Sequence, residues 1–349
     1  MTTGPQITVV TCLRDEGPFV VDWIAHLRAI GVTRILAYTN DCRDGTGALL
    51  DTLAPTGVVH EPLGKVRGRP GPAPQWQALR AAWTHPAVEG AEWVACLDCD
   101  EYPALTDGDL PGLIASCGDA QAIAMPWRLF GWSGRVAPGA GPTPVRFDRC
   151  ARSDMAFPAQ ASFFKTLFRR DGPFDGFGIH RPRQTATPRF ADAAGSLSSD
   201  LAANPGRILL WPPGDAGGDR RVQLNHYSIR SAEEFLIKRE RGLPSRTGKE
   251  IGLAYWIERN FNQTTCDRIA RHLGPMVEGA KRLRALPGVA EAEAAARAAH
   301  AASLERILAT GEGARMLARL ILAGGSTPPP APLARRLLDL YRTAREAAE

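Results

Sequence analysis

Hydrophobic and polar positions follow two alternating periods along the first hundred residues. A mostly apolar, β-branched run at residues 7–13 predicts a buried strand, and apolar side chains then recur at helical spacing from Phe19 to Ile30, before Gly31. The order repeats, with strands predicted at residues 32–38, 58–63 and 91–98 and a helix at residues 75–83. Alternating strands and helices with short connections predict a parallel sheet with helices on both faces.

The pattern weakens from about residue 130 to residue 222. Short strand candidates lie around and within this stretch between Gly- and Pro-rich turns, at residues 121–127, 162–168 and 207–211. A regular pattern of apolar positions resumes near residue 223. Within it, Ser231 and Glu234 form a capping box that begins a helix. We therefore expect a mixed sheet with long loops in the middle of the chain.

The C-terminal part of the sequence is Ala-rich and helical in pattern. A Pro-rich tract at residues 326–332 predicts a hinge before a last amphipathic helix. We expect one α/β domain over residues 1–248 and a helical C-terminal region over residues 249–349.

Composition and charge narrow the class of protein. Hydrophobic residues make up 44% of the 349 residues and charged residues 23%, which is ordinary for a globular protein. The net charge of +5 comes from scattered Arg residues without a dense basic block, so we expect no nucleic-acid partner. No run approaches the roughly 18 apolar residues of a membrane span. A soluble protein is expected, with peripheral membrane contact left open.

The N-terminus and the cysteines favour a cytoplasmic location. No basic region precedes a long apolar stretch, as it would in a signal peptide. The seven Cys are an odd number at irregular spacing, which favours reduced thiols.

Three carboxylates follow the apolar run at residues 93–97, namely Asp98, Asp100 and Glu101. In an extended chain Asp98 and Asp100 point to the same side. Carboxylates this close repel one another unless a cation lies among them, and oxygen ligands suit Mg²⁺ or Mn²⁺. The sequence therefore predicts a divalent-metal site here, and a solvated acidic turn is the plain alternative.

Two further acidic loops follow the first two predicted strands. They contain Glu16 in RDEG and Asp41 and Asp44 in NDCRDGT. The carboxyl ends of parallel strands meet at one edge of a sheet, so we expect these loops to lie near Asp98. Asp41 and Asp44 could each instead form an Asx-turn or a helix N-cap, and for Asp44, directly before Gly45, this structural role fits as well as a role in the site.

Residues 7–50, 75–83 and 92–102 together resemble bacterial family-2-like nucleotide-sugar glycosyltransferases of the GT-A fold. The family pattern is a strand, a K/R-N-E-like loop, a D-N-x-S-x-D-G-T turn and D-x-D-E after a later strand. The likeness extends from about residue 7 to residue 135, and residues 226–242 resemble the segment that closes such domains. It implies a Rossmann-like mixed α/β sheet with helices on both faces, and a C-terminal helical extension lies outside it.

The resemblance implies roles for single residues. Asp98 and Asp100 would hold Mn²⁺ or Mg²⁺ and through it the donor diphosphate, Glu101 would buttress them, and His226 would be a late metal ligand. The donor-binding residues would be Arg14, Glu16, Asp41, Asp44, Gln75, Asp98, Lys238 and Arg241. The sequence departs from the family pattern in two places: RDE replaces the commoner K-N-E, and the turn lacks the usual Ser. The nucleobase that the donor carries is therefore left open.

Direct, inverting sugar transfer also requires a base for the acceptor hydroxyl. We assign Asp175 as the first candidate and Glu101 as the second catalytic carboxylate, with Asp154 as an alternative to Asp175. A turn is the plain alternative for Asp154 and for Asp175. His180 could replace His226 as a metal ligand, and a packed His is the plain alternative for both.

We expect a metal-dependent, hexosyltransferase-like enzyme that moves a sugar from a nucleotide diphosphate donor to a saccharide or lipid-linked acceptor, with inversion. A metal-dependent phosphohydrolase or nucleotidyltransferase would use the same aspartates on a phosphoryl centre. A non-catalytic glycan-binding protein that keeps the fold is the third possibility.

Overall fold

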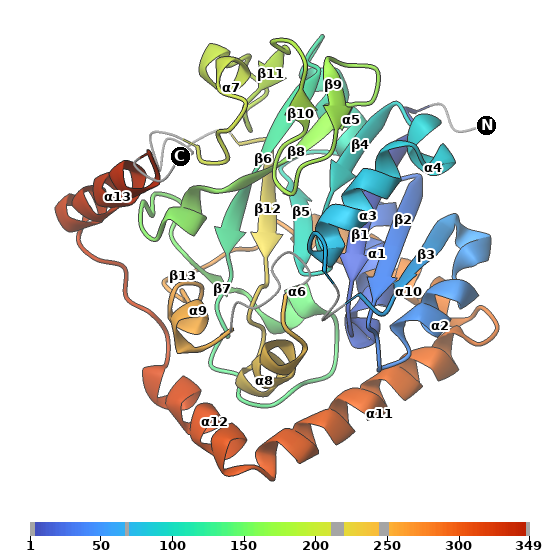
Figure 1. Ribbon diagram of the computed structural model, residues 1–349, viewed down its shortest axis with the longest axis vertical. Coiled ribbons are helices and arrows are strands. Elements are labelled where there is room, and N and C mark those ends of the chain that lie inside the picture. Colours follow the sequence, from blue (N-terminus) through green and yellow to red (C-terminus); the bar gives the residue numbers. More distant parts are fainter. Residues whose placement is uncertain (1–3, 67–69, 211–219, 244–250, 347–349) are drawn as a thin grey trace.

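A computed structural model describes residues 4–66, 70–210, 220–243 and 251–346 of the chain (Figure 1). One large sheet forms the centre, helices cover both of its faces, and C-terminal helices pack around it. The predicted fold class is therefore confirmed: the protein has an α/β, Rossmann-like mixed sheet of the GT-A type with a C-terminal helical extension.

The central sheet combines a parallel half with a mixed half. Its strands are β1 (Ile7–Leu13), β2 (Arg34–Asn40), β3 (Val58–Gly64), β4 (Trp93–Cys96), β5 (Glu101–Leu105), β6 (Ala122–Leu129), β8 (Phe164–Arg169), β11 (Phe190–Ala191) and β12 (Val222–His226). The strand order is β3-β2-β1-β4-β8-β6-β12-β5, and β11 pairs with β6. β1 to β4 are parallel, whereas β8 is antiparallel to β4 and β6. β12 is parallel to β6 and antiparallel to β5.

Two short strand pairs lie beside this sheet. β9 (Phe174–Gly176) pairs with β10 (Arg183–Gln184), and β7 (Arg149–Cys150) pairs with β13 (Thr264–Thr265). The second pair joins the C-terminal region to the middle of the chain.

The helices of the described residues are distributed over the whole chain. They are α1 (Gly17–Ala29), α2 (Thr46–Thr52), α3 (Pro74–Trp83), α4 (Pro86–Glu89), α5 (Leu110–Ser116), α6 (Thr143–Arg146), α7 (Ser199–Ala203), α8 (Ala232–Arg241), α9 (Leu253–Ile257), α10 (Ala270–Arg284), α11 (Val289–Leu308), α12 (Gly311–Ala323) and α13 (Ala331–Glu346), with 3₁₀ turns at Ala54–Thr56 and Ala159–Ser162.

The two faces of β1 show how the sheet is covered. Side chains alternate along a strand, so Ile7 and Val9 pack under α1 and α10, whereas Val10 and Cys12 pack under α3 and α4. α1 ends where the pattern predicts, because Gly31 adopts a φ of +94° that a β-branched residue would resist. Both sides of the parallel half are therefore buried, and its ligand-accessible part is the edge where the strands end.

The C-terminal region is helical, as predicted, and packs on the α/β domain. α10 lies along α1, and α11 contacts α1, α2 and α8 as it crosses the lower part of the molecule in Figure 1. Residues 327–330 of the Pro-rich tract are non-helical and separate α12 from α13. The proposed domain boundary at residue 248 lies outside the described residues.

Most predicted elements are confirmed, and one is not. The capping box of Ser231 and Glu234 is present at the start of α8. The strand predicted at residues 207–211 is reduced to one bridge between Leu209 and Phe163, and residue 211 lies outside the described residues.

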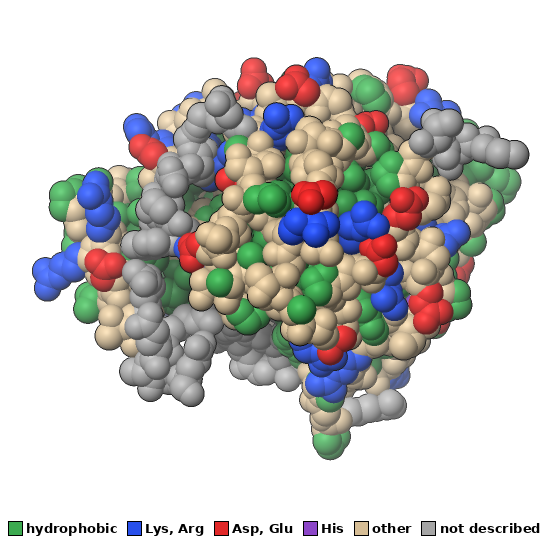
Figure 2. All heavy atoms as spheres, turned by 90° about the horizontal axis from the view of Figure 1, so that it is seen from above, with side chains coloured by type: hydrophobic (Ala, Val, Ile, Leu, Met, Phe, Trp, Pro, Cys, Tyr) green, Lys and Arg blue, Asp and Glu red, His purple; other side chains and the backbone are tan. Residues whose placement is uncertain are grey.

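Within the described residues, no helix is both long and apolar enough to cross a membrane. Figure 2, which views the molecule from the top of Figure 1, shows acidic and basic side chains next to one another. The positive net charge is therefore not gathered into one patch on that face.

Candidate functional site

The acidic motif lies in a turn. β4 ends at Cys96, β5 begins at Glu101, and the Glu101 N–H donates to the carbonyl oxygen of Asp98 at 2.9 Å. The expectation of an extended chain that presents Asp98 and Asp100 on one side is therefore wrong, because the chain turns between them. The two carboxylates bind different partners.

Asp98 is held from two other elements. The side-chain amide of Gln75 on α3 donates to Asp98 Oδ1 at 2.9 Å, and Lys165 Nζ on β8 lies 3.2 Å from Oδ2. Lys165 is fully buried, whereas the side chain of Asp98 is 31% exposed. The structure thus brings Asp98 and Gln75 together, as expected, and leaves one side of the carboxylate open to a ligand.

Glu101 is buried beneath Asp98 and buttresses the turn. Its carboxylate accepts hydrogen bonds from the Trp127 indole N–H at 2.8 Å and from the Asp98 N–H at 2.8 Å. Lys165 Nζ lies 3.3 Å from Glu101 Oε2. Burial raises the pKa of Glu101 to about 8, and the charges of Asp98 and Asp100 add to this effect against the opposing charge of Lys165.

Asp100 lies between a lysine and a histidine. Lys238 Nζ on α8 donates to Asp100 Oδ2 at 2.7 Å, and His226 Nε2 at the end of β12 lies 3.6 Å from Oδ1. Burial alone would raise the pKa of Asp100, but the charge of Lys238 and the nearby His226 hold it well below its usual value. Burial lowers the pKa of His226 despite the neighbouring Asp100, so its imidazole is neutral and able to bind a metal.

Two of the three predicted metal ligands, Asp100 and His226, lie side by side. Asp100 Oδ1 and His226 Nε2 face each other, and His226 Nδ1 is buried without a hydrogen-bond partner. Asp98 does not complete a compact three-ligand group with them. Among the described residues, Asp15, Cys42 and Asp44 are the group of three whose ligand atoms all lie within 4.8 Å of one another.

A second cluster fixes the loop that follows β1. Arg230 Nη1 lies 3.2 Å from Glu16, and the guanidinium of Arg241 binds both the Glu16 carboxylate and the Arg14 carbonyl. The charge of Glu16 raises the pKa of Arg230 and of Arg241 although burial opposes it. Arg14, Glu16 and Arg241, which the sequence predicts at the donor site, are therefore side by side.

The loops after β1 and β2 share an uncommon backbone conformation. Asp15 and Asp41 both have a φ of +48°, which Asp tolerates better than most residues. Asp41 Oδ2 accepts hydrogen bonds from the Asn40 side chain at 3.1 Å and from the Val66 N–H at 3.3 Å. These bonds hold the loop after β2 against the segment after β3.

Asp44 has a structural role within this edge. Its carboxylate accepts hydrogen bonds from the N–H groups of Gly17 at 3.0 Å and Thr46 at 2.9 Å, and His300 Nε2 of α11 lies 3.1 Å away. Hydrogen bonds from His300 and Thr46 outweigh burial and lower the pKa of Asp44. The Asx-turn alternative describes these contacts well.

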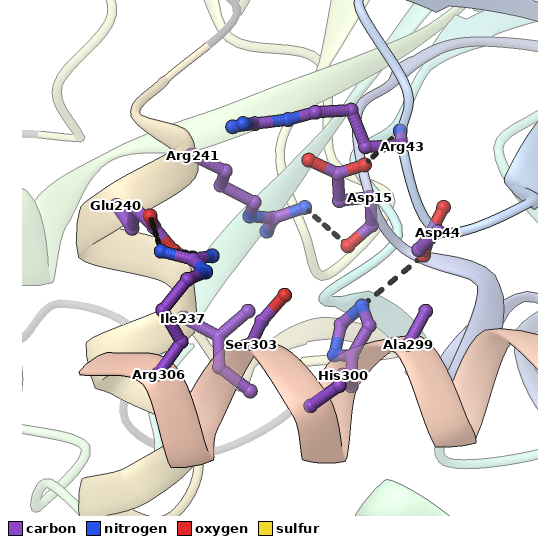
Figure 3. A pocket seen from close by; sticks show the side chains of 11 residues that line it. Asp15, Arg43, Asp44, Ile237, Glu240, Arg241, Ala299, His300, Ser303 and Arg306 are labelled. Atoms are coloured by element: carbon purple, nitrogen blue, oxygen red, sulfur yellow. Dashed lines mark hydrogen bonds and ion pairs between the residues drawn. The ribbon is translucent and has the colours of Figure 1, made fainter. Parts of the chain in front are cut away.

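A cavity of about 280 Å³ opens between these loops, α8 and α11 (Figure 3). Arg241 points toward Asp15, His300 points up from α11 to Asp44, and Arg306 pairs with Glu240 at the rim. Both signs of charge line the cavity. Its wall therefore combines a C-terminal helix with loops of the sheet edge.

Two other candidates form no hydrogen bond with the acidic turn among the described residues, and His180 lies beside the site, against Trp127. Asp175 on β9 is 46% exposed and pairs with Arg183 at 2.5 Å, and no hydrogen bond of the described residues joins it to the acidic turn. The ring of His180 packs 5.2 Å from that of Trp127, and its Nδ1 lies 3.0 Å from the Phe164 carbonyl oxygen. Burial lowers the pKa of His180 to about 3.

Sequence reasoning missed several residues that touch the site. Lys165, Trp127, Arg230 and His300 each contact a predicted residue from a distant element. Lys165 gave a signal, because it is the single charge in the apolar run at residues 162–168. Trp127 belongs to an aromatic segment at residues 125–135, which is a signal for sugar contact or core packing, whereas Arg230 and His300 gave none.

No known family model matches the chain, and no curated protein matches it in sequence. Among solved structures, HddC from Yersinia pseudotuberculosis is similar at 12% identity and a TM-score of 0.30, over 54% of this chain and 89% of that one. Glucosyl-3-phosphoglycerate synthase from Mycobacterium tuberculosis, bound to Mn²⁺, UDP and glucosyl-3-phosphoglycerate, is similar at 17% identity and a TM-score of 0.23. That match covers 36% of this chain and 45% of the synthase, less than half of its length. At these identities and TM-scores the likenesses do not bear on the substrate of this chain.

Proposed function

We propose that this protein is a metal-dependent glycosyltransferase that moves a sugar, with inversion, from a nucleotide diphosphate donor to a saccharide or lipid-linked acceptor. One observation carries the proposal. At the carboxyl edge of the sheet, Asp100 Oδ1 and the neutral His226 Nε2 lie 3.6 Å apart, with the partly exposed Asp98 on the same turn. Such a set of oxygen and imidazole ligands suits Mn²⁺ or Mg²⁺.

The residues around Asp100 have complementary tasks in this proposal. A bound divalent cation would neutralise charge on the leaving diphosphate. Lys238 keeps Asp100 ionised and oriented, and Arg241 keeps Glu16 in place. Gln75 holds Asp98 toward the open side of the turn. Arg14 and Asp41, on the neighbouring loops, are the residues we assign to the nucleoside part of the donor.

The acceptor base stays a prediction. Asp175 is an exposed carboxylate that an acceptor can reach, although Arg183 now binds it. Glu101 is fully buried and bonded to Trp127, so we assign it to orienting the Asp98–Asp100 turn.

One observation favours a second candidate function, a non-catalytic nucleotide- or glycan-binding protein. Each aspartate of the motif already has a buried lysine partner, Lys165 for Asp98 and Lys238 for Asp100. Two ammonium groups supply the cationic charge that the carboxylates require even without a metal.

A thermal-shift screen with nucleotide sugars, with and without Mn²⁺, tests the proposal, because a ligand that binds only the folded state raises its stability. We expect one nucleotide sugar to stabilise the protein more with Mn²⁺, and incubation with acceptors to release the nucleoside diphosphate. Stabilisation without turnover would favour the binding protein. Release of free phosphate or pyrophosphate would favour a phosphohydrolase or nucleotidyltransferase, and no effect of any nucleotide would contradict the proposed glycosyltransferase.

A further inference from the structure

The last helix, α13, carries apolar side chains that its contact with the rest of the protein does not cover. Ala334 and Leu338 are 5% and 1% exposed, so this side of the helix is buried. Leu333, Leu340 and Tyr341 are 45%, 58% and 36% exposed. Leu333 and Leu340 are separated by about two helical turns and therefore lie on one side of α13. The apolar stripe of α13 is thus wider than the contact that holds the helix in place.

The helix before it, α12, has an apolar end that faces solvent. Met316 and Leu320 anchor α12 in a core that includes Trp256 of α9. In the last turn of α12, Ile321 is 42% exposed and Leu322 is 86% exposed. Two large apolar side chains are therefore exposed on a helix that is itself fixed in the fold.

Both helices lie on the outside of the molecule. They are at the left margin of Figure 1, where residues 324–330 connect them. The cavity of Figure 3 is lined by residues of other elements. The exposed apolar side chains of α12 and α13 thus belong to an outer surface, which fits a broad partner better than a peptide that binds in a groove.

Basic residues accompany the exposed apolar side chains. Residues 311–346 contain six Arg and three acidic residues, so they carry +3 of the net charge of +5. Arg315 and Arg319 of α12 and Arg335 and Arg336 of α13 are exposed. Most of the net positive charge of the chain therefore lies in the same two helices, which favours an anionic partner.

Exposed apolar and basic side chains on one helix are typical of helices that lie in the interface of a lipid bilayer. The apolar side chains enter the boundary between headgroups and acyl chains, and anionic headgroups attract the arginines. The ring and hydroxyl of Tyr341 also suit this depth. A second copy of the chain is a poorer partner, because a symmetric contact would bring the positive charges of both copies together.

We propose that the exposed sides of α12 and α13 bind the surface of an anionic lipid bilayer. Leu322, Leu333 and Leu340 enter the headgroup region, and the arginines of the two helices lie at the level of the headgroups. The binding is peripheral. It requires neither a nucleotide nor an acceptor, so the proposal does not depend on sugar transfer.

Co-sedimentation of the full chain with lipid vesicles tests this surface. We expect the protein to sediment with vesicles that contain phosphatidylcholine and phosphatidylglycerol in equal parts. Vesicles of phosphatidylcholine alone should bind it roughly tenfold or more weakly, and added salt should weaken binding to the anionic vesicles. No sedimentation of wild type with the anionic vesicles, or equal binding to both kinds of vesicle, would overturn the proposal.

A leucine variant and its control assign the binding to α13. Leu340→Gln should weaken vesicle binding roughly tenfold or more, because the bilayer no longer buries this leucine. Leu197→Gln is the matched control, since Leu197 is 56% exposed in the segment between β11 and α7. It should bind as wild type does. Equal binding of the two variants would count against α13 and overturn the proposal.

An arginine variant tests the charge. Arg336→Gln should weaken binding to the anionic vesicles roughly fivefold and leave binding to phosphatidylcholine unchanged. Arg282→Gln, at an exposed position of α10, is the control and should bind as wild type does. The same affinity for both arginine variants would overturn the assignment of these charges to the membrane.

A second leucine variant extends the test to α12. Leu322→Gln should also weaken vesicle binding roughly tenfold. It decides the question if Leu340→Gln proves less stable than wild type, because Leu322 is almost fully exposed. Unchanged binding of Leu322→Gln would then overturn the proposal.

Sedimentation velocity without lipid distinguishes the bilayer from a second copy of the chain. We expect the same sedimentation coefficient for wild type and Leu340→Gln. A wild-type dimer that Leu340→Gln dissociates would assign the surface to a second copy and overturn the proposal.

Discussion

The ammonium group of Lys238 and the carboxylate of Asp100 form a buried ion pair, with Nζ 2.7 Å from Oδ2. This pair joins the end of α8 to the turn between β4 and β5, across 138 residues of sequence. It also leaves the other oxygen of Asp100 facing His226. The geometry of the candidate metal ligands therefore depends on a lysine that does not need to bind the metal.

Removal of this lysine should destabilise the fold. In Lys238→Met the buried Asp100 carboxylate loses its closest cation, so we expect a loss of about 3–5 kcal/mol in the free energy of unfolding, measured by urea denaturation. Lys281→Met is the control, because Lys281 pairs with Glu278 at the exposed surface. A Lys238 variant as stable as the Lys281 variant would show that the pair contributes nothing.

Asp44 should matter for stability through its hydrogen bonds. Asp44→Ala leaves the buried N–H of Gly17 and the Thr46 groups without an acceptor, so we expect a loss of about 2–4 kcal/mol in the free energy of unfolding. Asp51→Ala serves as the control, since its side chain is 69% exposed. If equilibrium denaturation shows the same loss in the free energy of unfolding for Asp44→Ala and Asp51→Ala, the hydrogen bonds of Asp44 do not stabilise the fold.

The fully buried His26 should make the protein sensitive to acid. Burial lowers the pKa of His26 to about 3, and its Nε2 lies 2.8 Å from the Pro103 carbonyl oxygen. Because the unfolded state then binds more protons, His26 contributes stability above pH of about 6.5 that is lost progressively toward pH 3.

A comparison with His26→Gln isolates the effect of His26 protonation on stability. The side-chain amide of Gln does not titrate and can still bond to the Pro103 carbonyl oxygen. Between pH 6.5 and pH 5, wild type should lose roughly 1.5 kcal/mol more than the variant in the free energy of unfolding. Parallel stability curves for the two proteins over this range would refute the assignment.

Cys266 should be the most reactive thiol of the chain. A hydrogen bond from Cys150 lowers the pKa of Cys266 to about 5 although burial opposes it, whereas burial raises the pKa of Cys42 to about 12. Both are half-buried, so Cys42 is the internal control. Iodoacetamide labelling at pH 6.5, followed by peptide mass spectrometry, should modify Cys266 first. Equal rates for the two thiols would contradict this.

The sequence predicts the parallel half of the sheet well, because β1, α1 and β2 each form from local patterns. Their apolar side chains recur at the period of the element that buries them. The turn at residues 98–101 was only the alternative to an extended chain, since local alternation does not reveal that β5 leaves the line of β4 to pair with β12.

The long-range partners of the site were beyond sequence reasoning for the same reason. Asp98 and Lys165 are 67 residues apart, and Asp44 and His300 are 256 residues apart. Only the tertiary fold decides that β8 lies beside β4 and that α11 crosses the edge of the sheet.

Mn²⁺ binding tests the central claim, that Asp100 and His226 hold a divalent cation for a nucleotide diphosphate. Titration of Mn²⁺ into the protein with a nucleoside diphosphate, followed by electron paramagnetic resonance of free Mn²⁺, should show one saturable site. Asp100→Asn and His226→Ala should each weaken it about tenfold to a hundredfold, while Asp175→Asn should bind as wild type does. Saturable binding that is equally strong in Asp100→Asn and His226→Ala, or no saturable site in wild type, would contradict the account.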